Sequence, residues 1–95
     1  MFKLSRLAAE DFRNIFEYTL IHFGVTKADD YTKALNAVLE TLSAHPEIGI
    51  SSEHLGERLK LHYYKRHAIY YRTEPFGLFV VRILHQQMNP DLHFS

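Results

Sequence analysis

The sequence of 95 residues has no cysteine, which excludes both a disulfide framework and a thiolate metal site. It has no apolar run near the roughly 18 residues that cross a membrane, and its first residues lack the apolar core of a signal peptide. It also lacks a glycine-rich phosphate loop and a Gly-x-Ser-x-Gly nucleophile turn. With 46% hydrophobic residues, the chain is expected to form one domain over residues 1–95, soluble and cytoplasmic, without a cofactor or membrane contact.

The net charge of zero conceals an uneven distribution along the chain. Residues 1–57 contain five Lys or Arg and nine Asp or Glu, whereas residues 58–95 contain six and two, so the two parts carry −4 and +4. The basic part also holds four of the six tyrosines. Basic residues with interleaved aromatics are typical of a surface for nucleic acid or for an acidic protein, but solvated helix faces and charges that flank strands produce the same pattern.

Two segments carry apolar residues along one face with the 3.6-residue period of an amphipathic helix. They run over residues 7–23 and 28–42. Gly24 suits a helix end, and the connection is too short for anything but an antiparallel hairpin. Thr26 followed by Asp29 resembles a capping box, which predicts that the second helix begins after Thr26.

Four short runs of apolar and β-branched residues are strand candidates, at residues 2–4, 59–64, 67–73 and 78–85. Short turns join the last three, so we expect them to be antiparallel neighbours. The predicted fold is α+β with the order β-α-α-β-β-β, in which a helical hairpin packs on one face of a small antiparallel sheet. We expect residues 46–57 to form a loop and residues 86–95 to form a tail that hangs off the last strand.

The last strand candidate contains Arg82 in the middle of the apolar run 80–85. A guanidinium inside a central strand is costly unless something pairs with it. Either Arg82 has a carboxylate partner within the fold, or it faces a surface that another molecule uses. On the preceding strand, Tyr70 and Tyr71 must point to opposite faces, so we expect Tyr71 to join Ile69 in the core and Tyr70 to lie on the open face.

Seven histidines raise the question of a metal site. Metal-binding histidines are commonly four residues apart on one helix or grouped with cysteines. Neither pattern occurs here, since His22, His45 and His54 are scattered and His62 and His67 fall on consecutive strand candidates. We therefore expect no metal site.

An ordered series of motifs runs through almost the whole chain. Its members are Ala8–Tyr18, Gly24–Tyr31, His45-Pro46-Glu47-Ile48-Gly49, His67–Arg72, Arg82–Asn89 and His93. Together they resemble the ParE branch of the RelE/ParE toxin superfamily, from bacterial type II toxin–antitoxin systems. The fourth member has the pattern H-x-I-x-Y-R. The fifth resembles R-[IV]-L-H-x-x-M-D, although Gln87 stands where that family often has Arg and Asn89 where it often has Asp.

The resemblance implies a toxin that poisons DNA gyrase by stabilising its cleaved-DNA state. It also implies a ParD-like antitoxin whose C-terminal segment wraps the toxin in a hetero-oligomer, with DNA contacted only through the antitoxin or gyrase. The residues expected to contact the target are Arg72, Arg82, His85 and Met88. The residues expected to contact the antitoxin are Phe12, Phe16 and Tyr70.

The sibling RelE-like toxins cleave mRNA on the ribosome, and this activity is the alternative. A metal-free ribonuclease needs a base, an acid and cations for the phosphate, and the basic sheet could supply cations with His85 as an acid. However, His67 occupies a strand position where several RelE-like enzymes carry an active-site Arg, and Gln86 follows His85 where some have a tyrosine. We therefore predict a protein that docks on its target without catalysis. A pure interaction module without toxicity also stays open.

Overall fold

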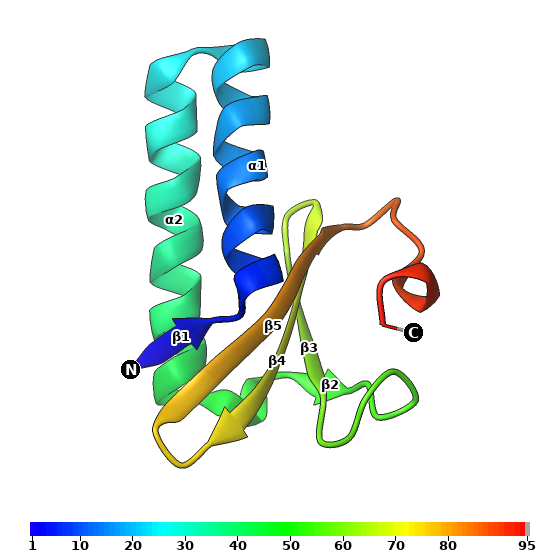
Figure 1. Cartoon of the computed structure of the whole chain (residues 1–95). Coiled ribbons are helices and arrows are strands. Elements are labelled where there is room, and N and C mark those ends of the chain that lie inside the picture. The colour runs from blue at the N-terminus through cyan, green and yellow to red at the C-terminus, as the bar shows by residue number, and fades with distance from the viewer. Residues whose placement is uncertain (95) are drawn as a thin grey trace.

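Figure 1 shows the computed structural model, which describes residues 1–94. The elements follow in the order β1 (Phe2–Leu4), α1 (Arg6–Phe23), α2 (Val25–Ala44), β2 (Ile50–Ser51), β3 (Lys60–Tyr64), β4 (His67–Glu74) and β5 (Gly77–His85), with 3₁₀ turns at Pro46–Ile48 and Pro90–Leu92. The helical hairpin covers one face of a five-stranded sheet of order β1-β5-β4-β3-β2. The predicted α+β fold is confirmed.

Two features of the sheet differ from the prediction. β1 pairs with β5 in parallel, so the sheet is mixed and not purely antiparallel. β2 lies in the segment expected to be a loop, and it pairs with the beginning of β3. A strand of two exposed residues carries no apolar alternation, so nothing in the local sequence indicates it.

The two helices reverse direction at a single residue, Gly24, whose φ of +92° lies in a region that side chains disfavour. α2 therefore begins at Val25 and has no side-chain cap, so the capping box predicted at Thr26 is wrong. The hairpin extends beyond the sheet (Figure 1), which leaves its far end uncovered. Neither helix, as described here, is long and apolar enough to cross a membrane.

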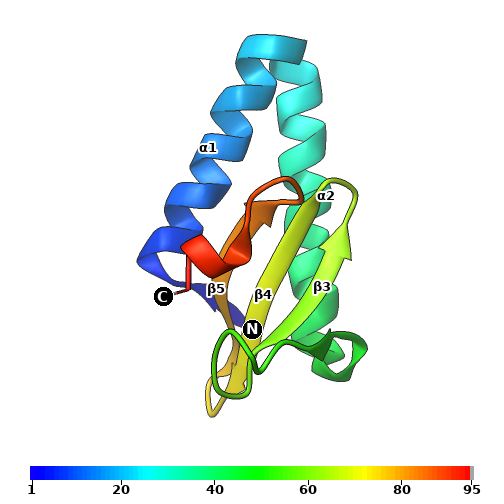
Figure 2. The same ribbon diagram turned by 90° about the vertical axis from the view of Figure 1, so that its right-hand side faces the viewer.

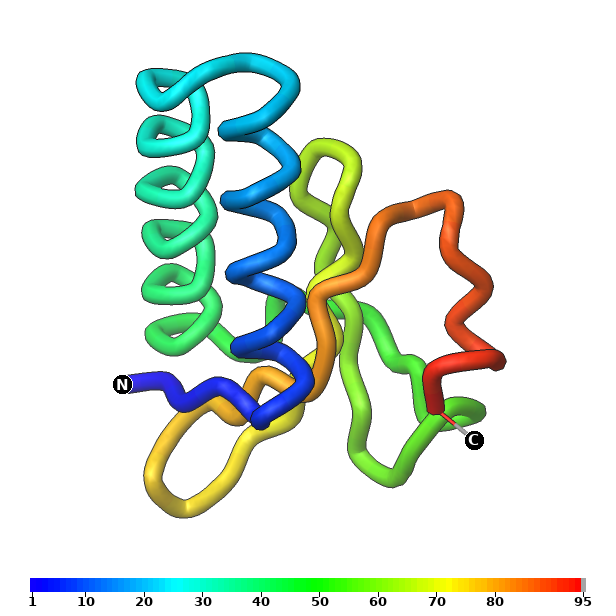
Figure 3. The backbone as a smooth tube through the Cα atoms, turned by 45° about the horizontal axis from the view of Figure 1, so that its top comes forward, coloured from blue at the N-terminus to red at the C-terminus, as the bar shows by residue number. Residues whose placement is uncertain are grey.

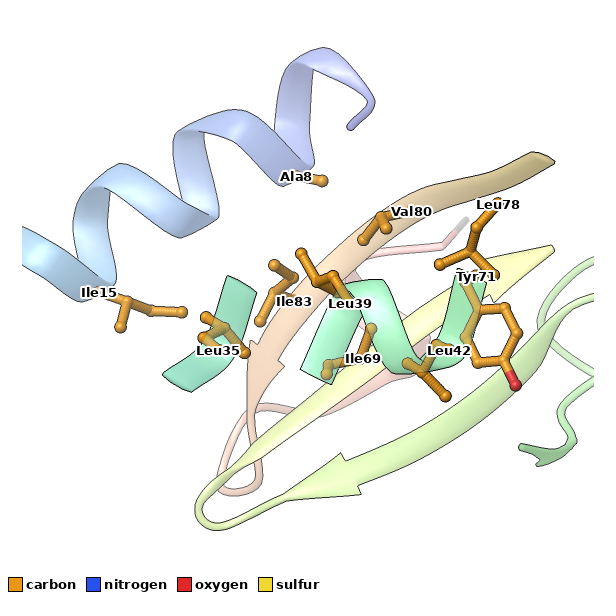
Figure 4. Close-up of a cluster of buried hydrophobic side chains, with 10 residues drawn as sticks. All are labelled: Ala8, Ile15, Leu35, Leu39, Leu42, Ile69, Tyr71, Leu78, Val80 and Ile83. Carbon is orange, nitrogen blue, oxygen red and sulfur yellow. The ribbon is translucent and has the colours of Figure 1, made fainter. Parts of the chain in front are cut away.

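The main core lies between the hairpin and the sheet (Figure 4). Its buried members are Ala8, Ile15, Leu35, Leu39, Leu42, Ile69, Tyr71, Leu78, Val80 and Ile83. Tyr71 lies there with Ile69, as the alternation along the strand predicted. The Tyr71 hydroxyl donates to the Pro46 carbonyl at 2.7 Å and accepts from the Gly49 N–H at 2.9 Å, and a Cβ at Gly49 would overlap it. The buried phenol therefore explains why this Pro-x-x-Gly motif ends in glycine.

The opposite face of the sheet carries a smaller core, formed by Leu59, Leu61, Ala68, Tyr70 and Leu84. The C-terminal segment folds back over this face (Figure 2), and its end approaches the loop before β3 (Figure 3). Phe94 packs on Tyr70 with ring centroids 4.9 Å apart, and Leu55 of the loop joins the same cluster. The prediction of a tail that hangs off the last strand is wrong, because the tail covers apolar surface that the sheet would otherwise expose.

β5 contains a bulge at Val81. The register shifts so that Arg82 pairs with Tyr70, while Val81 has no partner across the ladder. Ser5 holds the bulge: its hydroxyl donates to the Val81 carbonyl at 2.7 Å and accepts from the Ala8 N–H at 2.9 Å. Because Ser5 is also the N-cap of α1, one side chain starts the helix and attaches it to the last strand.

Candidate functional site

A groove of about 1150 Å³ lies between the helical hairpin, the turn that joins β3 to β4, the start of β4 and the end of β5. The helices line it with apolar and aromatic side chains that include Ile15, Tyr18 and Tyr31. The turn between β3 and β4 adds Lys65 and Arg66. The sheet and the start of the tail add His67, His85 and Met88. The groove therefore combines an apolar wall with a basic edge.

Three rings from three elements meet in this groove: Tyr31 from α2, His67 from β4 and His85 from β5. The Tyr31 hydroxyl lies 2.7 Å from Nδ1 of His67. The two histidines are paired across the β4–β5 ladder, with ring centroids 5.5 Å apart and planes at 85°. Across residues 1–94, no group of three or more His, Asp or Glu side chains is arranged to hold a metal ion.

Burial sets the protonation of Tyr31 and His67. It raises the pKa of Tyr31 to about 12, with a further contribution from Tyr64. It lowers the pKa of His67, and the neighbouring His85 lowers it further, whereas Asp11 acts in the opposite direction. At neutral pH, Tyr31 therefore keeps its proton and His67 is uncharged.

Arg82 lies beside the groove in an ion pair with Asp11 of α1. Its Nε and Nη2 are 2.8 and 2.9 Å from the two carboxylate oxygens, and the same carboxylate accepts the Ile83 N–H at 2.9 Å. The two side chains are only 13% and 12% exposed, and the hydrogen bonds that Arg82 donates to Asp11 raise the pKa of Arg82. Of the two alternatives for Arg82, the structure has the carboxylate partner. The guanidinium expected to contact the target is therefore engaged within the fold, and the target contact stays a prediction.

The other three residues expected to contact the target do not form one surface. His85 and Met88 both line the groove, and Met88 is 47% exposed. Arg72 lies on the opposite face of the sheet, since its neighbour Tyr71 faces the helices. There the Arg72 guanidinium stacks 5.0 Å from the centre of the Phe79 ring, and its Nε is 2.6 Å from the Glu74 carboxylate.

The residues expected to contact the antitoxin are less accessible than the groove. Phe12 packs against the main core, and Phe16 is half-buried on the same helix. Tyr70 is 4% exposed and lies under Phe94, so it is out of reach of a partner while the tail stays in place.

The sequence reasoning missed the exposed apolar end of the hairpin. Tyr18, Ile21, Phe23 and Val25 are 60%, 78%, 59% and 59% exposed, next to the turn at Gly24. Apolar side chains gathered in this way commonly mark an interaction surface. The periodicity placed Phe23 on a buried stripe, because the sequence does not show how far the helices extend past the sheet. It also gave no sign that Tyr31 would meet His67.

Comparison with known proteins places the chain in a family. The sequence model described as "ParE toxin of type II toxin-antitoxin system, parDE" matches residues 2–90. Toxin ParE1 of Caulobacter vibrioides is 33% identical over 94 residues, which cover 99% of this chain and 97% of the relative. Toxin ParE1 of Mycobacterium tuberculosis is 29% identical over 89 residues, which cover 93% and 91%.

The fold agrees with this similarity. A chain in a solved structure titled "Chromosomal ParDE TA system from P. aeruginosa" superimposes with a TM-score of 0.75 at 16% identity, over 88% of this chain and 92% of that one. The family match spans nearly the whole chain, as does the 33% identical relative. The chain therefore belongs to the ParE toxins of type II toxin–antitoxin systems.

Proposed function

We propose that this protein inhibits DNA gyrase by stabilising its cleaved-DNA complex, and that a ParD-like antitoxin neutralises it. The observation that carries the proposal is membership of the ParE toxin family over residues 2–90. The geometry supports a docking protein, because a small domain with an open groove and an exposed apolar hairpin end offers surface for larger partners.

The groove suits an acidic amphipathic segment of the antitoxin. Its apolar wall, with Ile15 and Tyr18, would bury the apolar side of such a segment, and Lys65 and Arg66 would attract its acidic side. A segment seated there would also cover Met88. Neutralisation in a hetero-oligomer would then follow from occlusion of the surface that meets the target, and DNA would be contacted only through the antitoxin or gyrase.

Expression of the protein without antitoxin should stop growth and induce a DNA-damage response, and co-expression of the antitoxin should restore growth. With purified gyrase, the protein should inhibit supercoiling and accumulate cleaved DNA. Met88→Ala should weaken this effect, whereas Leu92→Ala is the control, because Leu92 is 75% exposed on the tail but does not line the groove. Gyrase supercoiling and cleavage that stay unchanged at high excess of the protein would refute the proposal.

A second candidate is ribosome-dependent mRNA cleavage, favoured by one observation. Tyr31, His67 and His85 place acid–base groups beside Lys65 and Arg66 in one groove. Primer extension on translated mRNA separates the two functions. New 5′ ends that appear with the wild-type protein and disappear with His85→Ala would establish the ribonuclease.

A further inference from the structure

The groove contains two imidazole rings whose Nδ1 atoms are both engaged within the protein. Nδ1 of His85 accepts the backbone N–H of Gln87 at 3.1 Å. Nδ1 of His67 lies 2.7 Å from the Tyr31 hydroxyl. Within residues 1–94, Nε2 of neither ring has a hydrogen-bond partner in the protein. The Nε2 atoms are therefore the ring nitrogens that remain for a ligand.

The hydrogen-bond network also assigns the tautomers. A backbone N–H can only donate, so Nδ1 of His85 accepts, and the proton of the neutral ring is on Nε2. The Tyr31 hydroxyl has no acceptor other than Nδ1 of His67 among the described residues, so its proton points to that atom. The raised pKa of Tyr31 and the lowered pKa of His67 agree with this arrangement. Two neutral rings, each with an Nε2–H donor that has no partner among residues 1–94, thus lie with their centroids 5.5 Å apart.

The charges around these donors favour an acidic ligand. Lys27, Lys65 and Arg66 line the groove and form no ion pair among residues 1–94. Of the two carboxylates in the lining, Asp11 is occupied by Arg82, which leaves Asp30. Two N–H donors with a surplus of cations match one carboxylate, which accepts through two oxygens.

We propose that His67 and His85 together bind a carboxylate side chain of the antitoxin segment that fills the groove, an inference that rests on the antitoxin partnership proposed above. A protein carboxylate fits better than a phosphate of RNA for two reasons. The lining of the groove includes the exposed apolar side chains of Tyr18, Phe23 and Met88, which suit the hydrophobic side of a peptide segment. The donors are neutral, whereas phosphate contacts rely mainly on Lys and Arg.

Paired substitutions test the donor at Nε2. His85→Asn keeps an acceptor near the position of Nδ1 but loses the Nε2 donor, whereas His85→Gln retains an N–H donor near that position. We expect the dissociation constant for the antitoxin to rise about tenfold or more in His85→Asn and to change less than about threefold in His85→Gln. His62→Asn is the control, since His62 lies on β3 outside the groove. Isothermal titration calorimetry with the full chain measures the effect.

Binding of wild-type protein and of His85→Asn with equal affinity would overturn the inference and leave the proposed function intact. Absence of any antitoxin binding to the wild type would instead overturn the proposed function. A second measurement does not need the antitoxin: long-range ¹H–¹⁵N spectra of the histidine side chains, recorded while sodium acetate is added. We expect both rings as Nε2–H tautomers and acetate-dependent shifts at His67 and His85 but not at His62. Shifts with inorganic phosphate or a short RNA, and none with acetate, would overturn the inference that the histidines bind a carboxylate and would favour a nucleic-acid contact.

Discussion

Replacement of Asp11 by alanine removes one carboxylate and three hydrogen bonds at once. Two of these bonds come from Arg82 and one from the Ile83 N–H. The Arg82 side chain, 13% exposed, would keep its charge without a partner. Removal of one member of a buried ion pair costs about 3–5 kcal/mol. Because both side chains retain some contact with water, we expect Asp11→Ala to lower the free energy of unfolding by about 3 kcal/mol, the lower end of this range.

This loss is large for a domain of this size. Domains of 60–100 residues lose roughly 4–8 °C in melting temperature per kcal/mol, so Asp11→Ala should melt on the order of 12–24 °C below the wild type. Urea unfolding followed by circular dichroism gives the free energy, and a thermal scan gives the melting temperature.

The matched control lies on the same helix. Arg6 and Glu10 form an ion pair with side chains 82% and 41% exposed, and exposed pairs contribute only about 0–1 kcal/mol. Glu10→Ala should therefore cost about 0.5 kcal/mol or less. An Asp11→Ala variant no less stable than Glu10→Ala would refute the reasoning.

A double-mutant cycle separates the pair from its surroundings. Arg82→Met replaces the guanidinium with an apolar side chain of similar length and should cost about 2 kcal/mol, since it leaves the Asp11 charge with one hydrogen bond. The double variant removes both charges and should lose about 2 kcal/mol less than the sum of the single variants. Additive losses would contradict a direct interaction between Asp11 and Arg82.

Three further predictions concern the groove, the Pro-x-x-Gly motif and the tail. Folding lowers the pKa of His67 below its usual value of 6.5, so between these two values the unfolded chain binds more protons than the folded chain. The free energy of unfolding should therefore fall as the pH decreases from 6.5 toward the lower folded pKa. Urea unfolding at a series of pH values should show a weaker pH dependence of this free energy in His67→Gln. Gly49→Ala should cost about 2 kcal/mol because its Cβ overlaps the Tyr71 hydroxyl, and combination with Tyr71→Phe should cost less than the sum in the same assay. Phe94→Ala should uncover Tyr70 and bring its raised pKa back toward 10.0, as measured by ¹³C NMR of the tyrosine rings; an unchanged pKa would argue against burial by the tail.

The elements that the sequence predicted well are those that local patterns encode. The helical hairpin follows from two apolar stripes with a glycine between them, and the three long strands follow from apolar runs separated by turn residues. The parallel pairing of β1 with β5 could not be predicted in this way, because register between distant strands depends on the assembled core. The tail was misread for the same reason: Phe94 is half-buried only because Tyr70 offers it an apolar surface.

The candidate site was predictable only in part. The cost of a charge within an apolar strand left two alternatives for Arg82, a carboxylate partner or a surface for another molecule, and the sequence did not identify Asp11, which is 71 positions away. His85 is one of the predicted contact residues, and it lies in the groove. Its neighbours there, Tyr31 and His67, are brought together across 36 positions, so no local spacing indicates them.

The bulge at Val81 connects these observations. If strict alternation continued along β5 from its core-facing start, Arg82 would point toward the helices, and Ile83 and His85 would point to the opposite face. The extra residue reverses this order, so that Ile83 joins the main core and His85 reaches the groove. The Ile83 N–H at the edge of the bulged strand then donates to Asp11, which also holds Arg82. A single inserted position in the strand thus produces the histidine pair that we propose binds the antitoxin.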